Sequence, residues 1–321
     1  MTETIPSILA PLKHDITEVN RILSGTYTGG TGYMEKIFRE VLGEGKRIRA
    51  GLVILVARMF KRPLKEFYGL AGAVELLHAA SLIHDDVVDG SGIRRGYEST
   101  HAKWSVEIAV LAGDFLFAEA VRMIADLRKP QLLGMATGAI SAICAGEIEE
   151  LMGEHAFMSR DEYFRNIEAK TATLFGTAVQ MSGLLARAEC QQIERLKEFG
   201  YAFGIAFQIM DDVLDLVGDE RHTGKPVGSD LASGVVTLPV ILYLENGGAS
   251  SYLDAVLNGE RTPEHIRHAI DDIRSSCAIR AAIAEARGYT NRAMEALAGL
   301  PECRECQILY NLAGCIIDPC N

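Results

Sequence analysis

The sequence is short of proline and of the alternating apolar pattern that marks β-strands. It has nine prolines and one tryptophan among 321 residues, and its apolar residues recur at intervals of three and four instead of alternating. That spacing is typical of helices, whereas strict alternation would indicate half-buried strands. Hydrophobic residues make up 48% of the chain and charged residues 23%, which excludes an intrinsically disordered chain. We therefore predict an all-α protein, and without a low-complexity linker we expect one domain over residues 1–321.

Positive charge is also scarce, because 32 Lys and Arg stand against 43 Asp and Glu and leave a net charge of −11. Proteins that bind nucleic acid or an anionic membrane surface need a basic face, so we expect neither partner. The longest apolar stretches, Leu52–Val56 and Val235–Leu244, fall short of the roughly 20 residues that span a bilayer. We expect no stable membrane insertion.

Cysteine usage gives no sign of a disulfide framework. The seven cysteines are an odd number, and the first residues carry no apolar signal stretch. We expect reduced thiols and a cytoplasmic protein. Cys303-x-x-Cys306 with Cys315 and Cys320 has the spacing of a metal cluster, but the stretch has a helical pattern and no glycine knuckle, so free thiols are the stronger interpretation.

Helical spacing runs through most of the chain. Long helices are predicted over residues 7–23, 33–42, 49–60, 65–89, 101–127, 132–152, 160–186 and 189–216. A stretch rich in Gly, Pro and Asp, Gly218–Gly234, is predicted to be the longest loop. Shorter helices are expected from Thr237 to the end of the chain.

An Asp-Asp-x-x-Asp motif occurs twice, at residues 85–89 and 211–215, each time late in a predicted apolar helix. Positions i and i+4 share a helix face, so the first and last aspartate of each motif stack one turn apart. Carboxylates packed so closely repel each other, and a hard divalent cation offsets that repulsion. Ligands that are all oxygen select Mg²⁺ over zinc or copper. The alternative is a solvated acidic helix end, which the presence of two such motifs disfavours.

Basic residues indicate what the metal would face, since carboxylate-held Mg²⁺ usually binds phosphate. The stretch Gly45–Arg49 places three cations at a predicted helix start, where free N–H groups also favour anions. Arg94-Arg95 follows the first acidic motif, Lys170 lies mid-chain, and Lys225 lies in a Gly-rich stretch. Each of these alone could be a surface charge. Together they predict a site for two diphosphates, one bridged by metal and one held directly by Arg and Lys.

The order of these motifs resembles that of trans-isoprenyl diphosphate synthases, and most of all that of the long-chain members. The stretches that carry the resemblance are Gly45–Arg49, Leu76–Asp89, Arg94–Gly96, Gly113–Leu116, Lys170–Ala172, Phe207–Asp212 and Gly224–Leu231. The resemblance implies a bundle of ten or more helices around a deep central cavity, with the two acidic motifs facing each other at its mouth. It also implies a homodimer.

The resemblance further implies an enzyme, a prenyltransferase that joins an allylic diphosphate to isopentenyl diphosphate head to tail, with three Mg²⁺ ions per active site. The metal would be held by Asp85, Asp89 and Asp211, and close by would lie Asp86, Asp212 and Asp215. The allylic diphosphate would be bound by Arg94, Lys170 and Lys225. Isopentenyl diphosphate would be bound by Lys46, Arg49, His78 and Arg95. The developing carbocation would be flanked by Thr171 and Gln208.

Two positions depart from the family pattern. Ala50 stands where the family commonly has proline, and we expect this to matter little. Val235 stands where the family usually has lysine, so one contact to the allylic diphosphate is missing. The consequence would be a lower affinity for that substrate, or a specialised or regulatory subunit.

Product length is predicted from the helix that carries the first acidic motif. Ser81 and Ala80 lie about one turn, or 6 Å, before its first aspartate, and the next turn offers Leu77. Short-chain members of the family commonly block the cavity there with an aromatic ring. Both side chains are small here, which predicts a long-chain product of about thirty to fifty carbons, with geranylgeranyl or farnesyl diphosphate as the alternative. Close helix packing alone would also explain small residues, and a stop at Phe117 or Met123 stays open.

A different class of protein shares one pattern. Glu75-x-x-His78 and Glu98-x-x-His101 match the Glu-x-x-His signature of ferritin-like di-iron bundles. That interpretation leaves the acidic and basic motifs without a role, so the prenyltransferase is favoured. A non-catalytic subunit of a heteromeric synthase is another alternative, but such subunits typically lose an acidic motif, and this chain keeps both.

Overall fold

Helices make up nearly all of the regular structure in the computed structural model, which describes residues 4–26, 32–43, 45–94, 97–152, 158–218 and 227–317. The predicted all-α class is confirmed. The first half contains α1 (Ile5–Leu9), the 3₁₀ turn η1 (Ala10–Leu12), α2 (Lys13–Gly25), α3 (Gly32–Val41), α4 (Ile48–Met59), α5 (Lys65–Val88), the short strands β1 (Ile93–Arg94) and β2 (Tyr97–Glu98), α6 (Thr100–Lys103), α7 (Val106–Asp126) and α8 (Pro130–Met152). The second half contains α9 (Arg160–Ile167), the π-helical turn η3 (Glu168–Ala172), α10 (Thr173–Leu185), α11 (Cys190–Val217), α13 (Ser229–Ser233), α14 (Leu238–Glu245), α15 (Ser251–Leu257), α16 (Pro263–Ser275), α17 (Ala278–Ala296) and α18 (Arg304–Cys315).

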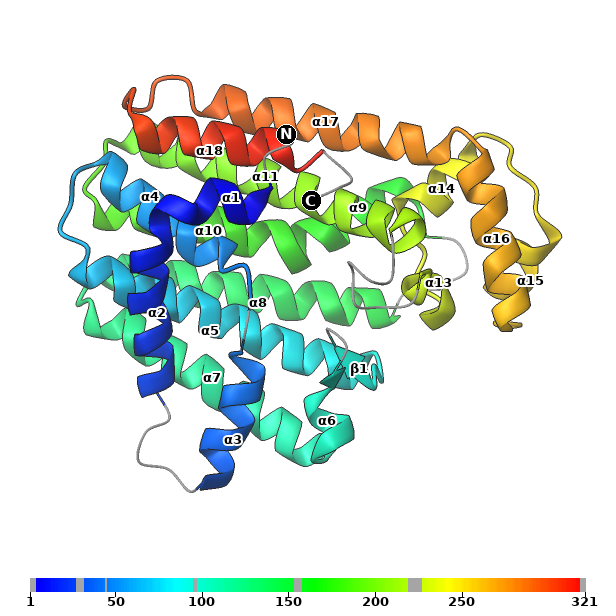
Figure 1. The fold of residues 1–321 in the computed structure, drawn as a ribbon, viewed down its shortest axis with the longest axis horizontal. Helices are drawn as coiled ribbons and strands as arrows, with labels where there is room; N and C mark the ends of the chain where they lie inside the picture. Colours follow the sequence, from blue (N-terminus) through cyan, green and yellow to red (C-terminus); the bar gives the residue numbers. More distant parts are fainter. Residues whose placement is uncertain are drawn as a thin grey trace.

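The long helices run side by side along the longest axis of the molecule (Figure 1). α5 packs along α7, α7 along α8, α10 along α11, and α11 along α17. At one end α2 packs across α5, and at the other end α15 and α16 form a pair. One continuous cluster of buried apolar side chains extends from Ile5 to Ile316. The ends of α5 and α11, where the sequence places the acidic motifs, are therefore anchored in a shared core.

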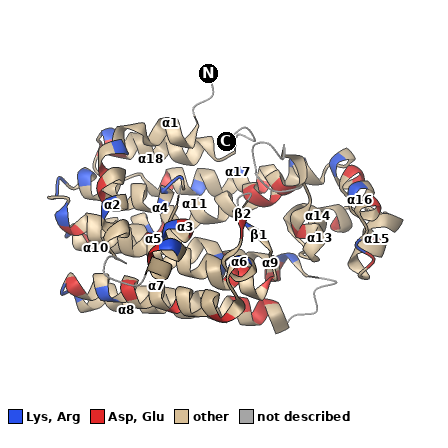
Figure 2. Ribbon diagram, turned by 60° about the horizontal axis from the view of Figure 1, so that its bottom comes forward, with Lys and Arg blue, Asp and Glu red and all other residues tan. Residues whose placement is uncertain are grey.

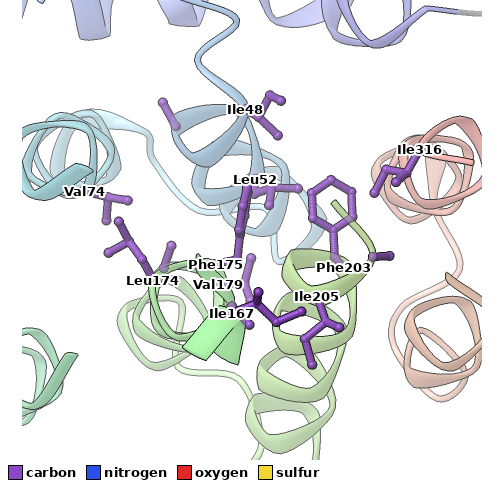
Figure 3. Close-up of a cluster of buried hydrophobic side chains, with 14 of the residues drawn as sticks. Ile48, Leu52, Val74, Ile167, Leu174, Phe175, Val179, Phe203, Ile205 and Ile316 are labelled. Carbon is purple, nitrogen blue, oxygen red and sulfur yellow. The ribbon is translucent and has the colours of Figure 1, made fainter. Parts of the chain in front are cut away.

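The centre of this core is formed by helices that have no polar face. Every residue of α4 except Arg58 is buried. A helix that is apolar all round is stable only when protein surrounds it. Figure 3 shows Leu52 of α4 pointing toward Phe175 of α10 and Phe203 of α11. Full burial of each such side chain contributes about 1.5–3 kcal/mol, so these contacts hold the start of α4 and the middle of α10 and α11 in fixed positions.

Glycines allow α11 to approach α10 and η3 closely. A Cβ atom added to Gly200 would lie 2.7 Å from the Cα of Gly176, and one added to Gly204 would lie 2.6 Å from the Cα of Ala172. Both contacts are with backbone, which cannot move aside as a flexible side chain can. The two glycines therefore set the spacing between the π-helical turn and the helix that carries the second acidic motif.

The structure interrupts helices that the sequence predicted to be continuous. The predicted helix over residues 7–23 is divided by the turn η1, which contains Pro11. The one over residues 101–127 is split before α7, where the Ser105 hydroxyl accepts a hydrogen bond from the backbone N of Ile108 at 3.2 Å and caps the new helix. The one over residues 160–186 contains the π turn η3, in which the Thr173 hydroxyl donates to the Glu168 carbonyl at 2.8 Å. π-Helical turns such as η3 are frequent at functional sites.

Short elements also lie where the sequence predicted breaks or loops. β1 and β2 pair in antiparallel register just after the first acidic motif, with Arg94 opposite Tyr97. α13 occupies part of the predicted loop 218–234 and is bounded by Gly228 and Gly234, both with left-handed φ angles. The last third is helical as predicted, although α17, at 19 residues, is not one of the shorter helices expected there.

Candidate active site

The first acidic motif lies at the end of α5. Asp85 and Asp86 are buried on the last turn, whereas Asp89 is exposed at the C-cap. Gly90 follows with a left-handed φ of 64°, and the helix ends there. Asp86 accepts a hydrogen bond of 2.6 Å from Nε of Arg94 on β1. The short strand pair thus brings a predicted diphosphate ligand, Arg94, back against the motif.

Asp85 is a buried carboxylate among charges of both signs. Burial raises its pKa to about 7, while Lys170 and Arg94 act to lower it and Glu147 and Asp89 to raise it further. Its negative charge is therefore only partly offset by the protein. A bound divalent cation would supply the missing positive charge.

The second acidic motif lies near the end of α11 and centres on Asp212. This carboxylate is buried and accepts two hydrogen bonds, from the Tyr163 hydroxyl at 2.6 Å and from Nε2 of Gln208 at 2.9 Å. Burial raises the pKa of Asp212 well above its usual range, and the negative charge of Asp230 adds to that effect. Burial also raises the pKa of Tyr163, with Asp212 as the next cause. Asp212 is thus oriented by protein groups on both of its oxygens.

The other two aspartates of this motif have different surroundings. Asp215 is partly buried, and its carboxylate accepts hydrogen bonds from the backbone N of Ser229 at 3.1 Å and of Asp230 at 3.3 Å. These bonds tie the start of α13 to α11. Asp211 is exposed. Hydrogen bonds from the protein thus hold three aspartates that were predicted to lie close to the metal without binding it: Asp86, Asp212 and Asp215.

Lys170 and Thr171 lie on η3, between the two motifs. The Thr171 hydroxyl donates to Oε1 of Gln208 at 2.7 Å. Nζ of Lys170 lies 2.7 Å from Oε1 of Glu147 on α8, and its charge also stabilises the ionised form of Asp85. One turn of π-helix therefore links both acidic motifs: the charge of Lys170 acts on Asp85, and Thr171 bonds to Gln208, which bonds to Asp212.

Three residues of this site were missed by the sequence reasoning. Tyr163 bonds to Asp212, while Glu147 and Glu150 of α8 lie 2.7 Å and 3.9 Å from Nζ of Lys170. These contacts join separate helices, so no spacing along the chain predicts them. The one available signal is that the two glutamates, three positions apart, follow a stretch without charged residues, 130–146.

The residues predicted for isopentenyl diphosphate lie at the start of α4 and on α5. Arg49 is buried, with its guanidinium carbon 4.0 Å from the centroid of the Phe175 ring, a cation–π distance. Lys46 is exposed just before α4, and it lines a cavity of about 930 Å³ between α2 and the segment before α4. His78 is half-buried on α5. The structure thus places these cations on neighbouring helices, because α4 packs against α5.

The sequence matches the family model described as polyprenyl synthetase over residues 31–273. The chain belongs to this family. It is 38% identical to heptaprenyl diphosphate synthase component 2 of Geobacillus stearothermophilus, over 84% of each chain. It is 34% identical to the all-trans-nonaprenyl-diphosphate synthase (geranyl-diphosphate specific) of Rhodobacter capsulatus, over 97% of each chain. A crystal structure of polyprenyl synthase from Caulobacter crescentus, complexed with calcium and isoprenyl diphosphate, aligns with a TM-score of 0.93 and 31% identity over 99% of this chain and 98% of that one.

Polyprenyl synthetase membership and the helical fold are thus confirmed, and the two relatives named above are a heptaprenyl and a nonaprenyl synthase, which are long-chain enzymes. Two predicted ligands, Arg95 and Lys225, lie outside the described residues, so their roles stay predictions. Val235, in place of the family lysine, is half-buried, and its backbone N donates to the Asp230 carbonyl at 2.9 Å.

The other departure from the polyprenyl synthetase pattern, Ala50, has a consequence that we did not expect. The backbone N of Ala50 donates to Oε1 of Glu75 at 3.0 Å. Proline has no N–H and could not make this bond. Ala50 therefore supplies a contact between α4 and α5 that proline could not make.

The di-iron alternative does not fit the geometry. Glu75 of the first Glu-x-x-His pair contacts Ala50 and Arg47, and His101 of the second pair hydrogen-bonds to Ser99 at 3.1 Å. Within the described ranges, no three His, Cys, Asp or Glu side chains are gathered as a metal site, and this includes the acidic motifs, so Mg²⁺ there would need diphosphate oxygens among its ligands. The six cysteines that the structure describes form no disulfide with one another.

Proposed function

We propose that this chain is a Mg²⁺-dependent trans-polyprenyl diphosphate synthase, which joins an allylic diphosphate to isopentenyl diphosphate and releases pyrophosphate. One observation carries the proposal: the π turn η3 links the two acidic motifs, because the charge of Lys170 acts on Asp85 and Thr171 bonds to Gln208, which bonds to Asp212. The heptaprenyl and nonaprenyl synthases among the relatives support a long-chain product.

The acidic residues fit Mg²⁺. Asp85 is a buried carboxylate whose charge is only partly offset, Asp89 follows it by one helical turn, and all the donors are oxygen atoms. Asp85, Asp89 and Asp211 would hold the ions, three per site by family resemblance. When bound, the metal neutralises diphosphate charge and stabilises the leaving pyrophosphate.

The protein's own side chains assist ionisation of the allylic C–O bond, whose electron pair leaves with the pyrophosphate oxygen. Lys170 and Arg94, both close enough to Asp85 to lower its pKa, provide N–H donors for that oxygen and its neighbours. The Thr171 hydroxyl and the Gln208 amide oxygen present the negative ends of their dipoles to the allylic cation. The double bond of isopentenyl diphosphate then forms the new C–C bond, and the released proton goes to pyrophosphate, because we identify no side-chain base among the described residues.

A carbocation must be protected from water, which would convert it to an alcohol. The segments of α5, α10 and α11 that precede or follow the polar motifs are lined by buried apolar side chains. The growing chain would lie among these apolar side chains.

The predicted path of the product follows α5. Ala80 and Leu77 are buried, and the Ser81 hydroxyl donates to the His78 carbonyl at 2.9 Å, so it needs no partner on a neighbouring helix. No aromatic ring stands at these three positions, which supports a long-chain product, with geranylgeranyl or farnesyl diphosphate as the alternative. Deeper along α5, a Cβ on Gly72 would lie 3.1 Å from Cε of Met123 on α7, which places this predicted stop about 20 Å from Asp85.

Product analysis with labelled isopentenyl diphosphate and allylic primers of increasing length tests the proposal. We expect long-chain products in Mg²⁺ and none in excess chelator. Asp85→Ala and Asp211→Ala should abolish turnover with little change in helical content, because each removes a metal ligand and not core packing. Asp126→Ala is the matched control, since Asp126 is an exposed acid paired with Arg122 at 3.0 Å. Full activity in chelator or in either site variant would refute the mechanism.

The proposed assembly is a homodimer formed through α7 and α8. Residues 130–146 carry no charge. By length and composition α8 could cross a membrane, and only 28% of its most apolar 18 residues is buried inside the protein. The prediction from long apolar stretches did not include this helix. In Figure 2 its acidic residues gather toward its C-terminal end. Exposed apolar side chains on both helices, such as Val110, Leu111 and Ile148, support cover by a second copy.

One other arrangement is distinguishable from the homodimer. The relative from Geobacillus is named component 2, which points to a partner chain in that enzyme. A protein that is active only with a second component would replace the homodimer. A cytoplasmic location is also proposed, supported by free thiols, of which Cys144, Cys190 and Cys277 are exposed.

A further inference from the structure

Glu75 is a buried carboxylate for which the proposed mechanism has no use. Its side chain is 5% exposed, in the middle of α5, among apolar neighbours. A carboxylate is rarely buried so deeply unless it is paired, because desolvation disfavours its charge. The partners of Glu75 indicate what it does.

The first partner is the start of α4. Oε1 of Glu75 accepts a hydrogen bond of 3.0 Å from the backbone N of Ala50, the third residue of that helix. The N-cap residue, Arg47, provides no side-chain cap of its own. Glu75 therefore satisfies one of the free N–H groups of α4 from a neighbouring helix, and its negative charge is favourable at a helix N-terminus.

The second partner is Arg47. Its Nη1 lies 3.4 Å from Oε2 of Glu75, its Nε donates to Oδ1 of Asn20 at 3.0 Å, and its Nη2 donates to the carbonyls of Leu42 and Gly43. Four contacts thus fix a side chain that is 11% exposed. Arg47 also has a left-handed φ of 49°, a conformation that non-glycine residues adopt at a cost of about 1 kcal/mol or more.

These contacts determine where the adjacent cations lie. Lys46 precedes Arg47, Arg49 follows it by two positions and stacks on Phe175, and His78 follows Glu75 by three positions on α5. The Arg47 side chain is turned inward and contacts Glu75, whereas Lys46, Arg49 and His78 are the basic residues that the family resemblance assigns to the diphosphate anion. Arg47 also offsets the charge of Glu75, which would otherwise weaken that anion's binding.

We infer that Glu75 is a positioning residue for isopentenyl diphosphate: it holds Arg47 and the N-terminus of α4 so that Lys46, Arg49 and His78 bind the diphosphate. This inference rests on the proposed function. Glu75 touches no substrate, and its effect passes through the backbone of residues 46–50. The same contacts assign Arg47, the middle cation of the basic motif, to structure instead of substrate binding.

The test compares Michaelis constants for the two substrates in Glu75→Ala, Glu75→Gln and wild type. Glu75→Ala should raise the KM for isopentenyl diphosphate about tenfold and change the KM for the allylic diphosphate by less than about twofold. Glu75→Gln keeps an oxygen acceptor for the N–H of Ala50 and should raise the isopentenyl KM by only about threefold. Arg47→Met should raise the same constant, and its combination with Glu75→Gln should be less than multiplicative, because the two residues act as a pair.

Asp15→Asn is the matched control. Asp15 is 1% exposed and joins α2 to α4 and α5 through Arg58 at 2.6 Å and the Tyr68 hydroxyl at 2.9 Å. Asp15 and Arg58 form an ion pair, as Glu75 and Arg47 do, but neither Asp15 nor Arg58 belongs to the basic motif Gly45–Arg49. Its loss should lower the melting temperature and leave both Michaelis constants unchanged.

Two results would overturn the inference. One is an unchanged isopentenyl KM in folded Glu75→Ala, and the other is an equal rise of both constants. If Glu75→Ala fails to fold, the same criteria apply to Glu75→Gln. A wild-type protein that consumes no isopentenyl diphosphate would refute the proposed function itself. If the wild type is active and both Michaelis constants of the variants rise together, only the inference about Glu75 fails.

Discussion

Asp212 shows how a carboxylate at this site acts on a neighbouring side chain. Its Oδ1 accepts from Nε2 of Gln208, and Oε1 of Gln208 in turn accepts from the Thr171 hydroxyl. An amide can turn over and exchange its nitrogen and oxygen, but Asp212 accepts only from the nitrogen. The carboxylate therefore fixes which end of Gln208 faces Thr171. Tyr163 occupies the other oxygen of Asp212 and limits its rotation.

Tyr163→Phe should lower kcat about tenfold, because buried Asp212 loses a donor, a loss that costs about 1–3 kcal/mol, and tenfold corresponds to about 1.4 kcal/mol. Steady-state kinetics with both substrates measures this. Tyr310→Phe is the control, since Tyr310 is 47% exposed on α18. A kcat in Tyr163→Phe equal to that of the control would show that Gln208 alone orients Asp212.

The residues with chemical roles were easier to predict than the residues that hold them. Asp85, Asp212, Lys170 and Gln208 belong to short motifs whose spacing is visible in one dimension. Tyr163 and Glu147 contact those motifs from other helices, and their identity depends on how the helices pack. Glu75 was noticed for the wrong reason, because its spacing to His78 matched an iron signature, whereas its partners lie on α4 and in the segment before it.

Among the secondary structure elements, η3 depends on how closely α11 can approach it. Gly204→Ala would place a methyl group 2.6 Å from the Cα of Ala172, so helix and turn must separate. We expect a loss of about 1–3 kcal/mol in the free energy of unfolding, the usual cost of overpacking a core. Because Thr171 and Gln208 would also move apart, kcat should fall.

Gly288→Ala is the matched control for this variant. Gly288 lies within α17 with no atom near its added Cβ, so alanine should stabilise the helix by about 0.5–1 kcal/mol. Denaturant unfolding of both variants makes the comparison. Equal stability of the two would mean that α11 shifts without cost and that the close contact does not hold η3 in place.

Ser81→Phe tests the α5 surface as the wall of the product site. A ring one turn before Asp85 should shorten the product sharply while the Mg²⁺ requirement stays the same, because the acidic motif is untouched. Chromatography of the dephosphorylated products measures chain length, and Ser251→Phe on exposed α15 is the control. A wild-type product of fifteen carbons would contradict the interpretation of small residues at positions 80 and 81.

The existence of the long helices was predictable, but the interruptions within them were not. Apolar spacing marked the helices over 65–89 and 189–216 almost to the residue, since α5 and α11 are buried along most of their length. The same spacing continues through η3, because one extra residue in a single turn changes the apolar spacing too little to be recognised in the sequence. Caps such as Ser105 and turns such as the one at Pro11 depend on single residues that occur in many other contexts.

For the whole molecule, the exposed face of α8 leads to a prediction about assembly. Ser141→Arg places a charge in the middle of the uncharged stretch 130–146, at an exposed position. We expect the wild type to be a dimer and this variant to dissociate, because a buried unpaired charge is costly at an interface. Size-exclusion chromatography with light scattering gives the masses, and Ser251→Arg controls for added charge.

Two outcomes would contradict the dimer. A monomeric wild type would leave the face of α8 without this partner. Sedimentation of the wild type with lipid vesicles, and its loss in Ser141→Arg, would instead assign the face to a membrane surface. Composition alone does not separate these cases, since a helix that meets a second copy and one that meets lipid share the same apolar pattern.

The ion pair between Lys170 and Glu147 has a consequence for the exchange of ligands. In the free protein Nζ of Lys170 lies 2.7 Å from Oε1 of Glu147, so in the proposed mechanism an arriving diphosphate would have to displace this carboxylate. A ligand with few other contacts, such as inorganic phosphate, would lose that competition, whereas a substrate bound at several points would win it. After the reaction, Glu147 is ready to take Lys170 back. In the proposed mechanism the carboxylate would thus oppose stray anions before catalysis and favour the departure of pyrophosphate after it.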